Sequence, residues 1–276
     1  MKFNIEHQTR FAFNKPVGYT IQQLRLTPES GFGQRVSNWQ LKVSGLSSPQ
    51  IDTFGNTTHT LVMDVPHQEI IISVTGEVET DLDSTTTTND ANETLTTKYE
   101  NLALPIYLRN TKLTEANDQV IQFSDQFLTK GEPHTLTMLT ALMHGVSQKI
   151  VCDKDTTEYQ QSAITTLAQG KGLSQGMAHL FISCCRAFKI PARLVHGYCY
   201  NHESKQLDYH SWADAWLIKD GWQSFDVANN ARSNGIHVRL ATGLDYRDAC
   251  PISRVMPDVV HEKMSINSKV HAIAQQ

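Results

Sequence analysis

The chain has 276 residues, of which 39% are hydrophobic and 19% charged, and its formal net charge is −4. These values are typical of a globular protein with one large or two modest cores, and they exclude a polyanion-binding surface because no basic cluster is present. No stretch approaches the roughly 18 consecutive apolar residues of a membrane span, and the N-terminal residues lack the apolar segment of a secretory signal. We therefore expect a cytoplasmic protein with neither nucleic-acid nor membrane partners. The five cysteines are odd in number, which argues against a disulfide framework.

Alternation of polar and apolar residues dominates the first part of the chain. Runs with period two occur at residues 3–7, 39–43 and 70–78. Turn residues separate the runs, beginning with Asn14-Lys15-Pro16. Several short strands with regular turns predict an antiparallel β-sandwich domain at residues 1–80. Residues 81–98 are polar and low in complexity, and they predict a linker or loop.

Helical periodicity begins near residue 115. Apolar residues then recur at spacings of three and four between residues 136 and 146, and a second helix is predicted over residues 162–168. A third helix is predicted from Ser174 to just before Pro191. Its apolar stripe includes the adjacent residues Cys184 and Cys185, which we expect in the core because cysteine behaves as a small hydrophobe.

The period returns to two after the third helix. Strands are predicted over residues 192–200, 210–218 and 222–226, and Asp220-Gly221 supplies a hairpin turn between the last two. Helices followed by antiparallel strands predict an α+β domain over residues 99–276.

Three polar residues occupy positions that favour nucleophilic chemistry. Ser174 stands at the start of the apolar helix, His210 opens one strand of the predicted hairpin, and Asp226 closes the other. Antiparallel pairing around the Asp220-Gly221 turn brings His210 and Asp226 roughly opposite each other. A helix packed on that hairpin would present its N-terminus to His210. The pattern predicts a nucleophile, a base and an orienting carboxylate, which is the arrangement used for acyl transfer.

The residues around these positions are similar to four motifs of bacterial transglutaminase-like proteins, which have a papain-like cysteine protease fold. The similar segments are 172–180 (Gly-Leu-Ser-Gln-Gly-Met-Ala-His-Leu), 189–198 (Lys-Ile-Pro-Ala-Arg-Leu-Val-His-Gly-Tyr), 210–214 (His-Ser-Trp-Ala-Asp) and 221–229 (Gly-Trp-Gln-Ser-Phe-Asp-Val-Ala-Asn). Segments at 5–11, 23–28, 52–56 and 66–67 resemble the β-rich N-terminal region of the same family. The resemblance covers about residues 1–250 and implies an N-terminal β-sandwich followed by a transglutaminase-like core.

By this resemblance, residue 174 would be the nucleophile, His210 the general base and Asp226 its orienting partner. The family has cysteine where this chain has Ser174, an acid where it has Gly176 and proline where it has Val227. A helix N-terminus and an imidazolium can convert a thiol to a thiolate at neutral pH, whereas a hydroxyl stays protonated and needs a well-placed base. A cysteine-to-serine change introduced by itself would not account for Gly176 and Val227.

Structural explanations stand beside the catalytic ones. Ser174 would make a good N-cap, because serine is among the residues preferred at that position. His210 and Asp226 would also suit a structural strand pair. No metal is expected, because His196 and Cys199 lie three apart on a strand and point to opposite faces. No cofactor is expected either.

Two functions follow from the sequence. One is a catalytically impaired or non-catalytic protein that binds a peptide or protein in the groove of a transglutaminase-like fold. The other is an active acyl-transfer enzyme, an amide hydrolase or transferase, that uses Ser174, His210 and Asp226.

Overall fold

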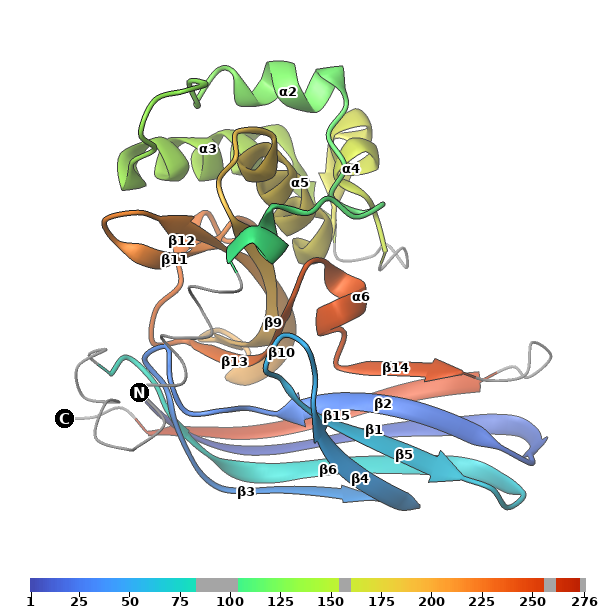
Figure 1. Ribbon diagram of the computed structural model, residues 1–276. Helices are drawn as coiled ribbons and strands as arrows, with labels where there is room; N and C mark the ends of the chain where they lie inside the picture. Colours follow the sequence, from blue (N-terminus) through green and yellow to red (C-terminus); the bar gives the residue numbers. More distant parts are fainter. Residues whose placement is uncertain (83–103, 154–159, 256–261, 274–276) are drawn as a thin grey trace.

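The computed structural model describes residues 1–82, 104–153, 160–255 and 262–273 (Figure 1). All but the first two residues of the predicted linker at 81–98 lie outside these ranges. In Figure 1, most of the helices form the upper layer, a five-stranded antiparallel sheet lies below them, and two further sheets form the base. The predicted α+β class, with a β-rich N-terminal region, is confirmed.

The base consists of two four-stranded antiparallel sheets. Their orders are β15-β1-β6-β3 and β14-β2-β5-β4. The strands are β1 (Lys2–Val17), β2 (Thr20–Thr27), β3 (Arg35–Val43), β4 (Leu46–Ile51), β5 (Thr57–Met63), β6 (His67–Glu79), β14 (Ile252–Val255) and β15 (Glu262–Ile273). Alternate residues of β1, such as Phe3 and Phe11, are buried, as the period of two predicts. The same buried cluster contains Tyr198 and Val238 of the five-stranded sheet, so the base and the core share one hydrophobic interior.

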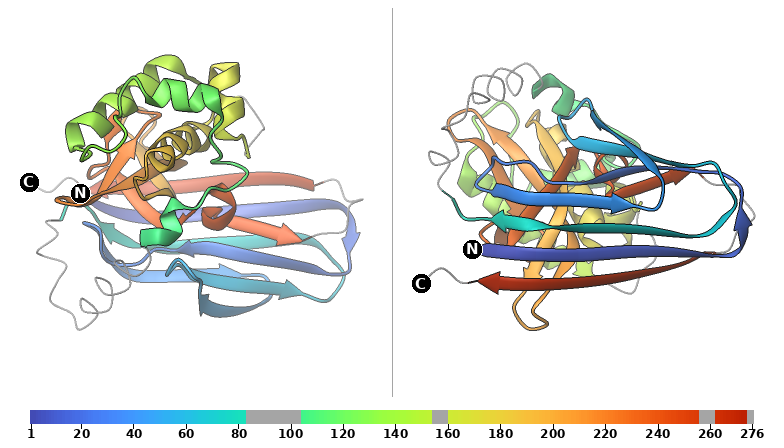
Figure 2. Two further views of the ribbon diagram at one scale, coloured as in Figure 1. Left: turned by 45° about the horizontal axis from the view of Figure 1, so that its top comes forward. Right: turned by 90° about the horizontal axis from the view of Figure 1, so that it is seen from below.

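Strands from the end of the chain complete both basal sheets. β15 pairs with β1 along most of its length, and β14 pairs with β2. Figure 2 shows β15, in red, beside β1, in blue. The sequence predicts that this segment belongs to the second domain, at residues 99–276. The pairing gives the outer edges of β1 and β2 hydrogen-bond partners that a sandwich of residues 1–80 alone would lack. The domain boundaries themselves stay a prediction.

The turn predicted at residues 14–16 is wrong. β1 continues to Val17, although its pairing with β6 shifts between Ala12 and Val17. Pro16 has no backbone N–H to donate to a ladder, and it interrupts the pairing without reversing the chain.

The core consists of a five-stranded sheet and a group of helices. The sheet has the order β12-β11-β10-β9-β13. Its strands are β9 (Ala192–Asn201), β10 (Gln206–Leu217), β11 (Gly221–Asp226), β12 (Ala231–Arg232) and β13 (His237–Gly243). The remaining elements are η1 (Leu104–Leu108), α2 (Asp118–Ser124), α3 (Leu136–Lys149), β7 (Val151–Cys152), α4 (Ala163–Gln169), β8 (Lys171–Gly172), α5 (Ser174–Ala187) and α6 (Tyr246–Ala249).

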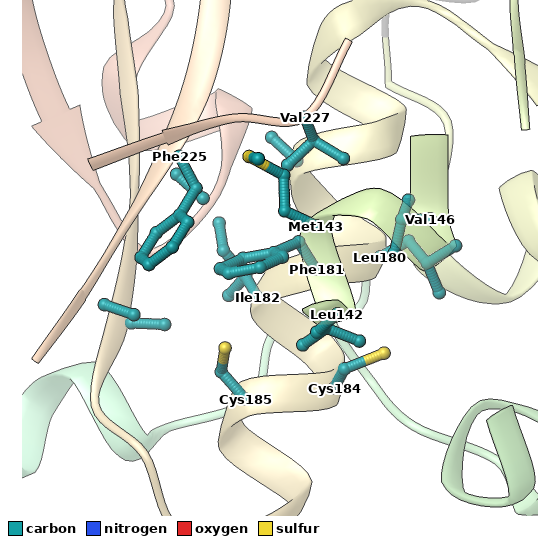
Figure 3. Packing of buried hydrophobic residues seen from close by; sticks show 14 of the residues in the cluster. Leu142, Met143, Val146, Leu180, Phe181, Ile182, Cys184, Cys185, Phe225 and Val227 are labelled. Atoms are coloured by element: carbon teal, nitrogen blue, oxygen red, sulfur yellow. The ribbon is translucent and has the colours of Figure 1, made fainter. Parts of the chain in front are cut away.

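Helix α5 runs through the centre of this core. Every residue from Gln175 to Arg186 is buried, because α2, α3 and α4 contact it on one side and the sheet on the other. Figure 3 shows Phe181 of α5 facing Phe225 of β11, with ring centroids 5.0 Å apart. Cys184 and Cys185 are fully buried, as predicted. A helix that is enclosed all round has a fixed position, and its N-terminus is therefore held rigidly against the sheet.

Side-chain amides dock the base on the core. Asn56 of the basal turn exchanges two hydrogen bonds with the backbone of Thr242 on β13, each 2.8 Å long. Gln34 does the same with the backbone of Arg239, at 3.0 and 2.8 Å. Each amide thus continues the hydrogen bonding of β13 as a neighbouring strand would. The turn at residues 52–56, which resembles a family motif, therefore fixes how the two parts meet.

Candidate active site

Ser174 is the first residue of α5. Leu173 occupies the N-cap position and makes no side-chain capping bond. The Ser174 hydroxyl accepts the backbone N–H of Ser211 on β10 at 3.2 Å and donates to Oε1 of Gln175 at 3.4 Å. The interpretation of Ser174 as an N-cap is therefore wrong, because its hydroxyl bonds across to the sheet and not to a first-turn N–H.

Glycines allow the start of α5 to pack closely against its neighbours. A Cβ at Gly172 would lie 2.4 Å from Oε1 of Gln161. A Cβ at Gly176 would lie 2.8 Å from Oγ1 of Thr166 and 3.0 Å from the same Gln161 oxygen. Gly176 departs from the family motif, and the buried side chains of Thr166 and Gln161 leave little room for a Cβ at this position.

His210 and Asp226 are in contact, as the hairpin predicted. They come from β10 and β11, which pair antiparallel, and Nε2 of His210 lies 2.7 Å from Oδ1 of Asp226. Asp226 is fully buried and His210 nearly so. Among the described residues, the hydrogen bonds of His210 use Nε2, so Nδ1 is not engaged in them.

Asp226 also binds a second histidine that the sequence analysis did not identify. Nε2 of His237 lies 2.8 Å from Oδ2 of Asp226, and the Asn229 amide donates to the same oxygen at 2.7 Å. The backbone N–H of Asn234 donates to Nδ1 of His237, so Nε2 of His237 carries the proton. Burial alone would raise the pKa of Asp226, but hydrogen bonds from His210 and His237 outweigh burial and hold its pKa well below the usual range. Asp226 is therefore an ionised acceptor.

His196 on β9 is a further histidine near His210. Its Nδ1 is 2.9 Å from the hydroxyl of Ser211, the residue whose N–H reaches Ser174. Burial, with the neighbouring His210 charge, lowers the pKa of His196 to about 3. His196 is therefore neutral and positions Ser211. Cys199 of the same strand pairs with His237 instead, and its sulfur lies 3.9 Å from Nε2 of His237.

Ser174, His210 and Asp226 line one pocket of about 1250 Å³ between the base and the core. Among the described residues, no hydrogen bond joins the Ser174 hydroxyl to His210. The base contributes the wall on β1, where His7 bonds to the hydroxyl of Tyr209, the residue before His210. Further lining residues include Thr9, Phe11, Cys199, Asn229, His237 and Met264.

Several motif residues have structural roles within the five-stranded sheet. Asp214 is fully buried and binds Arg193 at 3.0 Å and Arg239 at 2.7 Å. Burial alone would raise the pKa of Asp214, but Arg239 and Arg193 hold it at about 2. Arg193 also stacks on Trp222, 4.0 Å from the ring centre. These motif positions therefore lock β9, β10 and β11 together.

Comparisons with known proteins agree with this architecture. Residues 3–79 match the family described as the bacterial transglutaminase-like N-terminal region, and residues 122–227 match the transglutaminase-like superfamily. Each match covers less than half of the chain, so the two segments are similar to that N-terminal region and to the transglutaminase-like core, in that order.

Two individual proteins match over nearly the whole length. The chain is 23% identical to an uncharacterized protein of Mycobacterium leprae over 267 residues, covering 92% of each chain. It also matches the crystal structure of a candidate cysteine protease from Cytophaga hutchinsonii, with a TM-score of 0.76 and 19% identity, covering 100% of this chain and 92% of the other. At this identity the second match shows the fold alone. Within the described ranges, no helix is long and apolar enough to cross a membrane.

Proposed function

We propose that this protein binds an extended peptide or protein segment in the pocket between base and core and is catalytically impaired. The bonding of Ser174 carries this proposal. A serine nucleophile must pass its proton to a base within hydrogen-bond reach, but this hydroxyl donates to the neutral amide of Gln175. It is also held by the N–H of Ser211.

The pocket supports a peptide ligand. Its volume of about 1250 Å³ is above the range of roughly 300–1,000 Å³ usual for small-molecule sites. Ser174 and Gln175 place the start of α5 on the pocket wall, where the positive end of the helix dipole can attract a backbone carbonyl of the ligand. Polar and apolar residues of both parts line the pocket, as suits a segment with mixed side chains.

Acyl transfer through Ser174, His210 and Asp226 is the second candidate. The 2.7 Å contact between His210 and Asp226 favours it, because a carboxylate on Nε2 leaves Nδ1 to act as a base. In that case the Ser174 oxygen would attack the substrate carbonyl and give its proton to His210. The first-turn N–H groups of α5 would stabilise the oxyanion.

Two variants at position 174 test whether peptides bind in this pocket. We would measure the binding of fluorescently labelled peptides from a casein digest, using fluorescence anisotropy. Ser174→Ala removes the hydroxyl but keeps the space, so binding should persist. Ser174→Trp places a bulky indole in the part of the pocket next to the start of α5, so binding should be strongly weakened. Retention of binding by the tryptophan variant would contradict the proposed site.

A fluorophosphonate probe tests the second candidate on the same proteins. An impaired site leaves wild type unlabelled over the time in which an active serine hydrolase reacts completely. Labelling that maps to Ser174 by mass spectrometry, and that Ser174→Ala and His210→Ala both abolish, would replace the binding proposal with acyl transfer.

A further inference from the structure

We propose that Cys199, Asp226 and His237 form a binding site for a thiophilic divalent cation such as Zn²⁺ on the wall of the pocket. One ligating atom from each of the three residues lies within 4.8 Å of the other two. All three residues line the pocket. The proposal does not rest on Ser174 or on peptide binding.

Strand pairing brings the sulfur and the imidazole together. Cys199 of β9 and His237 of β13 are direct partners in the antiparallel ladder, so their side chains lie on the same face of the sheet. Asp226 then approaches from the end of β11. Three ligands from three strands of one sheet give the site a rigid frame.

The distances suit a tetrahedral ion. Zinc–sulfur bonds of about 2.3 Å and zinc–nitrogen or zinc–oxygen bonds of about 2.0–2.1 Å place neighbouring ligand atoms roughly 3.3–3.7 Å apart. Sγ of Cys199 and Nε2 of His237 are 3.9 Å apart, close to that separation. Nε2 of His237 and Oδ2 of Asp226 are 2.8 Å apart and must move apart by about half an ångström.

The donor set favours zinc over harder ions. A thiolate, an imidazole and a carboxylate are the ligand types that zinc accepts, whereas Mg²⁺ and Ca²⁺ require oxygen ligands. Three protein ligands leave a fourth position for water or for a ligand in the pocket.

Neighbouring groups can adjust to the ion. When Nε2 binds the metal, its proton moves to Nδ1, which lies 3.4 Å from the carbonyl of Asn234. The Asn234 N–H, which donates to Nδ1 at 3.2 Å without the metal, must then turn away so that Nδ1 can donate to the carbonyl, the outer-shell bond typical of such histidines. One proton is then released to solvent, from the Cys199 thiol, because the histidine proton only changes nitrogen.

Asn229 competes with the ion. Its amide lies 2.7 Å from Oδ2 of Asp226 and 3.9 Å from Sγ of Cys199, so it occupies the space between two ligands. It must swing away when a cation binds. Removing the amide should therefore strengthen metal binding, whereas removing a ligand should weaken it.

Co²⁺ and Zn²⁺ binding to the metal-stripped full-length protein tests the site. Co²⁺ bound by a thiolate gives a near-ultraviolet charge-transfer band, and Zn²⁺ should displace it with one ion per chain. Cys199→Ser should abolish the band and weaken Zn²⁺ binding about tenfold or more. Asn229→Ala should strengthen Zn²⁺ binding severalfold. Cys152→Ser, which changes another half-buried cysteine of the pocket wall, should leave both measurements unchanged.

Other results would overturn the proposal. Three results with the Co²⁺ band would contradict the proposed ligands: no band in wild type, a band that persists in Cys199→Ser, or a band that is lost in Cys152→Ser. His237→Gln gives a second test, with circular dichroism to show that the variant is folded. Zn²⁺ binding at wild-type strength in folded His237→Gln would also contradict the site. None of these readouts measures peptide binding or turnover, so they are independent of the proposed function.

Discussion

Ser174→Cys should create an activated thiol if the site around residue 174 is intact. The residue begins a fourteen-residue helix, and its side chain receives the N–H of Ser211 at 3.2 Å. A hydrogen bond to a charged group is worth about 1.5–3 kcal/mol, and a helix N-terminus stabilises a charge by about 0.3–1 kcal/mol. Together they stabilise the thiolate by about 2–4 kcal/mol. At about 1.4 kcal/mol per pKa unit, the thiol pKa should fall from about 8.5 to roughly 5.5–7.

The pH dependence of alkylation by iodoacetamide measures this pKa. The experiment is best done in a Cys199→Ser background, because Cys199 lines the same pocket. Cys184 serves as an internal unreactive control, since burial raises its pKa to about 12. Mass spectrometry of the peptide containing residue 174 follows the reaction. His210→Ala in the same background should raise the midpoint if the imidazolium also stabilises the thiolate.

A midpoint near 8.5 that ignores His210→Ala would refute this reasoning. It would mean that neither the start of α5 nor the N–H of Ser211 stabilises a charge at position 174. A lowered midpoint without turnover of amide or ester substrates would instead show that the electrostatics survive and that the surrounding geometry limits catalysis.

Three further predictions concern the scaffold. Gly176→Asp restores the residue type of the family motif. It should destabilise the fold by about 1–3 kcal/mol, because the new Cβ would lie 2.8 and 3.0 Å from buried oxygens. Urea unfolding measures this loss of stability, and an unchanged unfolding midpoint would contradict the prediction. Asp214→Asn leaves the buried Arg193 and the partly buried Arg239 without their carboxylate and should cost about 3–5 kcal/mol; a loss under about 1 kcal/mol would show that these ion pairs are dispensable. Stability should fall as the pH drops from about 6.5 to about 4, because the unfolded chain protonates its histidines below about 6.5 whereas burial lowers the pKa of four of them in the folded protein. The pKa of His59 is lowered less than that of the other three, which together give a slope of up to about 4 kcal/mol per pH unit. Those residues are His7 and His179, each with a pKa lowered to about 4, and His196, with a pKa lowered to about 3. Urea unfolding at several pH values tests this slope, and equal stability at pH 7 and pH 4.5 would be the contrary result.

Local signals in the sequence were enough to predict much of the core. The period change after residue 115 gave the helices, and the Asp220-Gly221 turn gave the hairpin that joins β10 and β11. Because hairpin register depends on a nearby turn, the 2.7 Å contact between His210 and Asp226 followed from the sequence. The burial of Cys184 and Cys185 followed from helical spacing.

Residue 174 marks the limit of such reasoning. Serine before an apolar helix favours an N-cap, yet Leu173 is the N-cap and the Ser174 hydroxyl bonds to β10. That partner is 37 residues away in sequence and is reached only when α5 packs on the sheet. Local preference gave way to a tertiary contact, because the backbone N–H of Ser211 offers the hydroxyl a partner that a first-turn N–H would otherwise supply.

Periodicity, turn chemistry and motif spacing by themselves determined the α+β class, the three central helices followed by the strands up to residue 226, and the His210–Asp226 pair. Tertiary structure alone decided that β15 pairs with β1, and that His237 joins Asp226 beside Cys199. These contacts link segments whose register is set by the packing of whole sheets, and no local residue pattern encodes such packing. The pocket, and the cation site proposed on its wall, exist only where those distant segments meet.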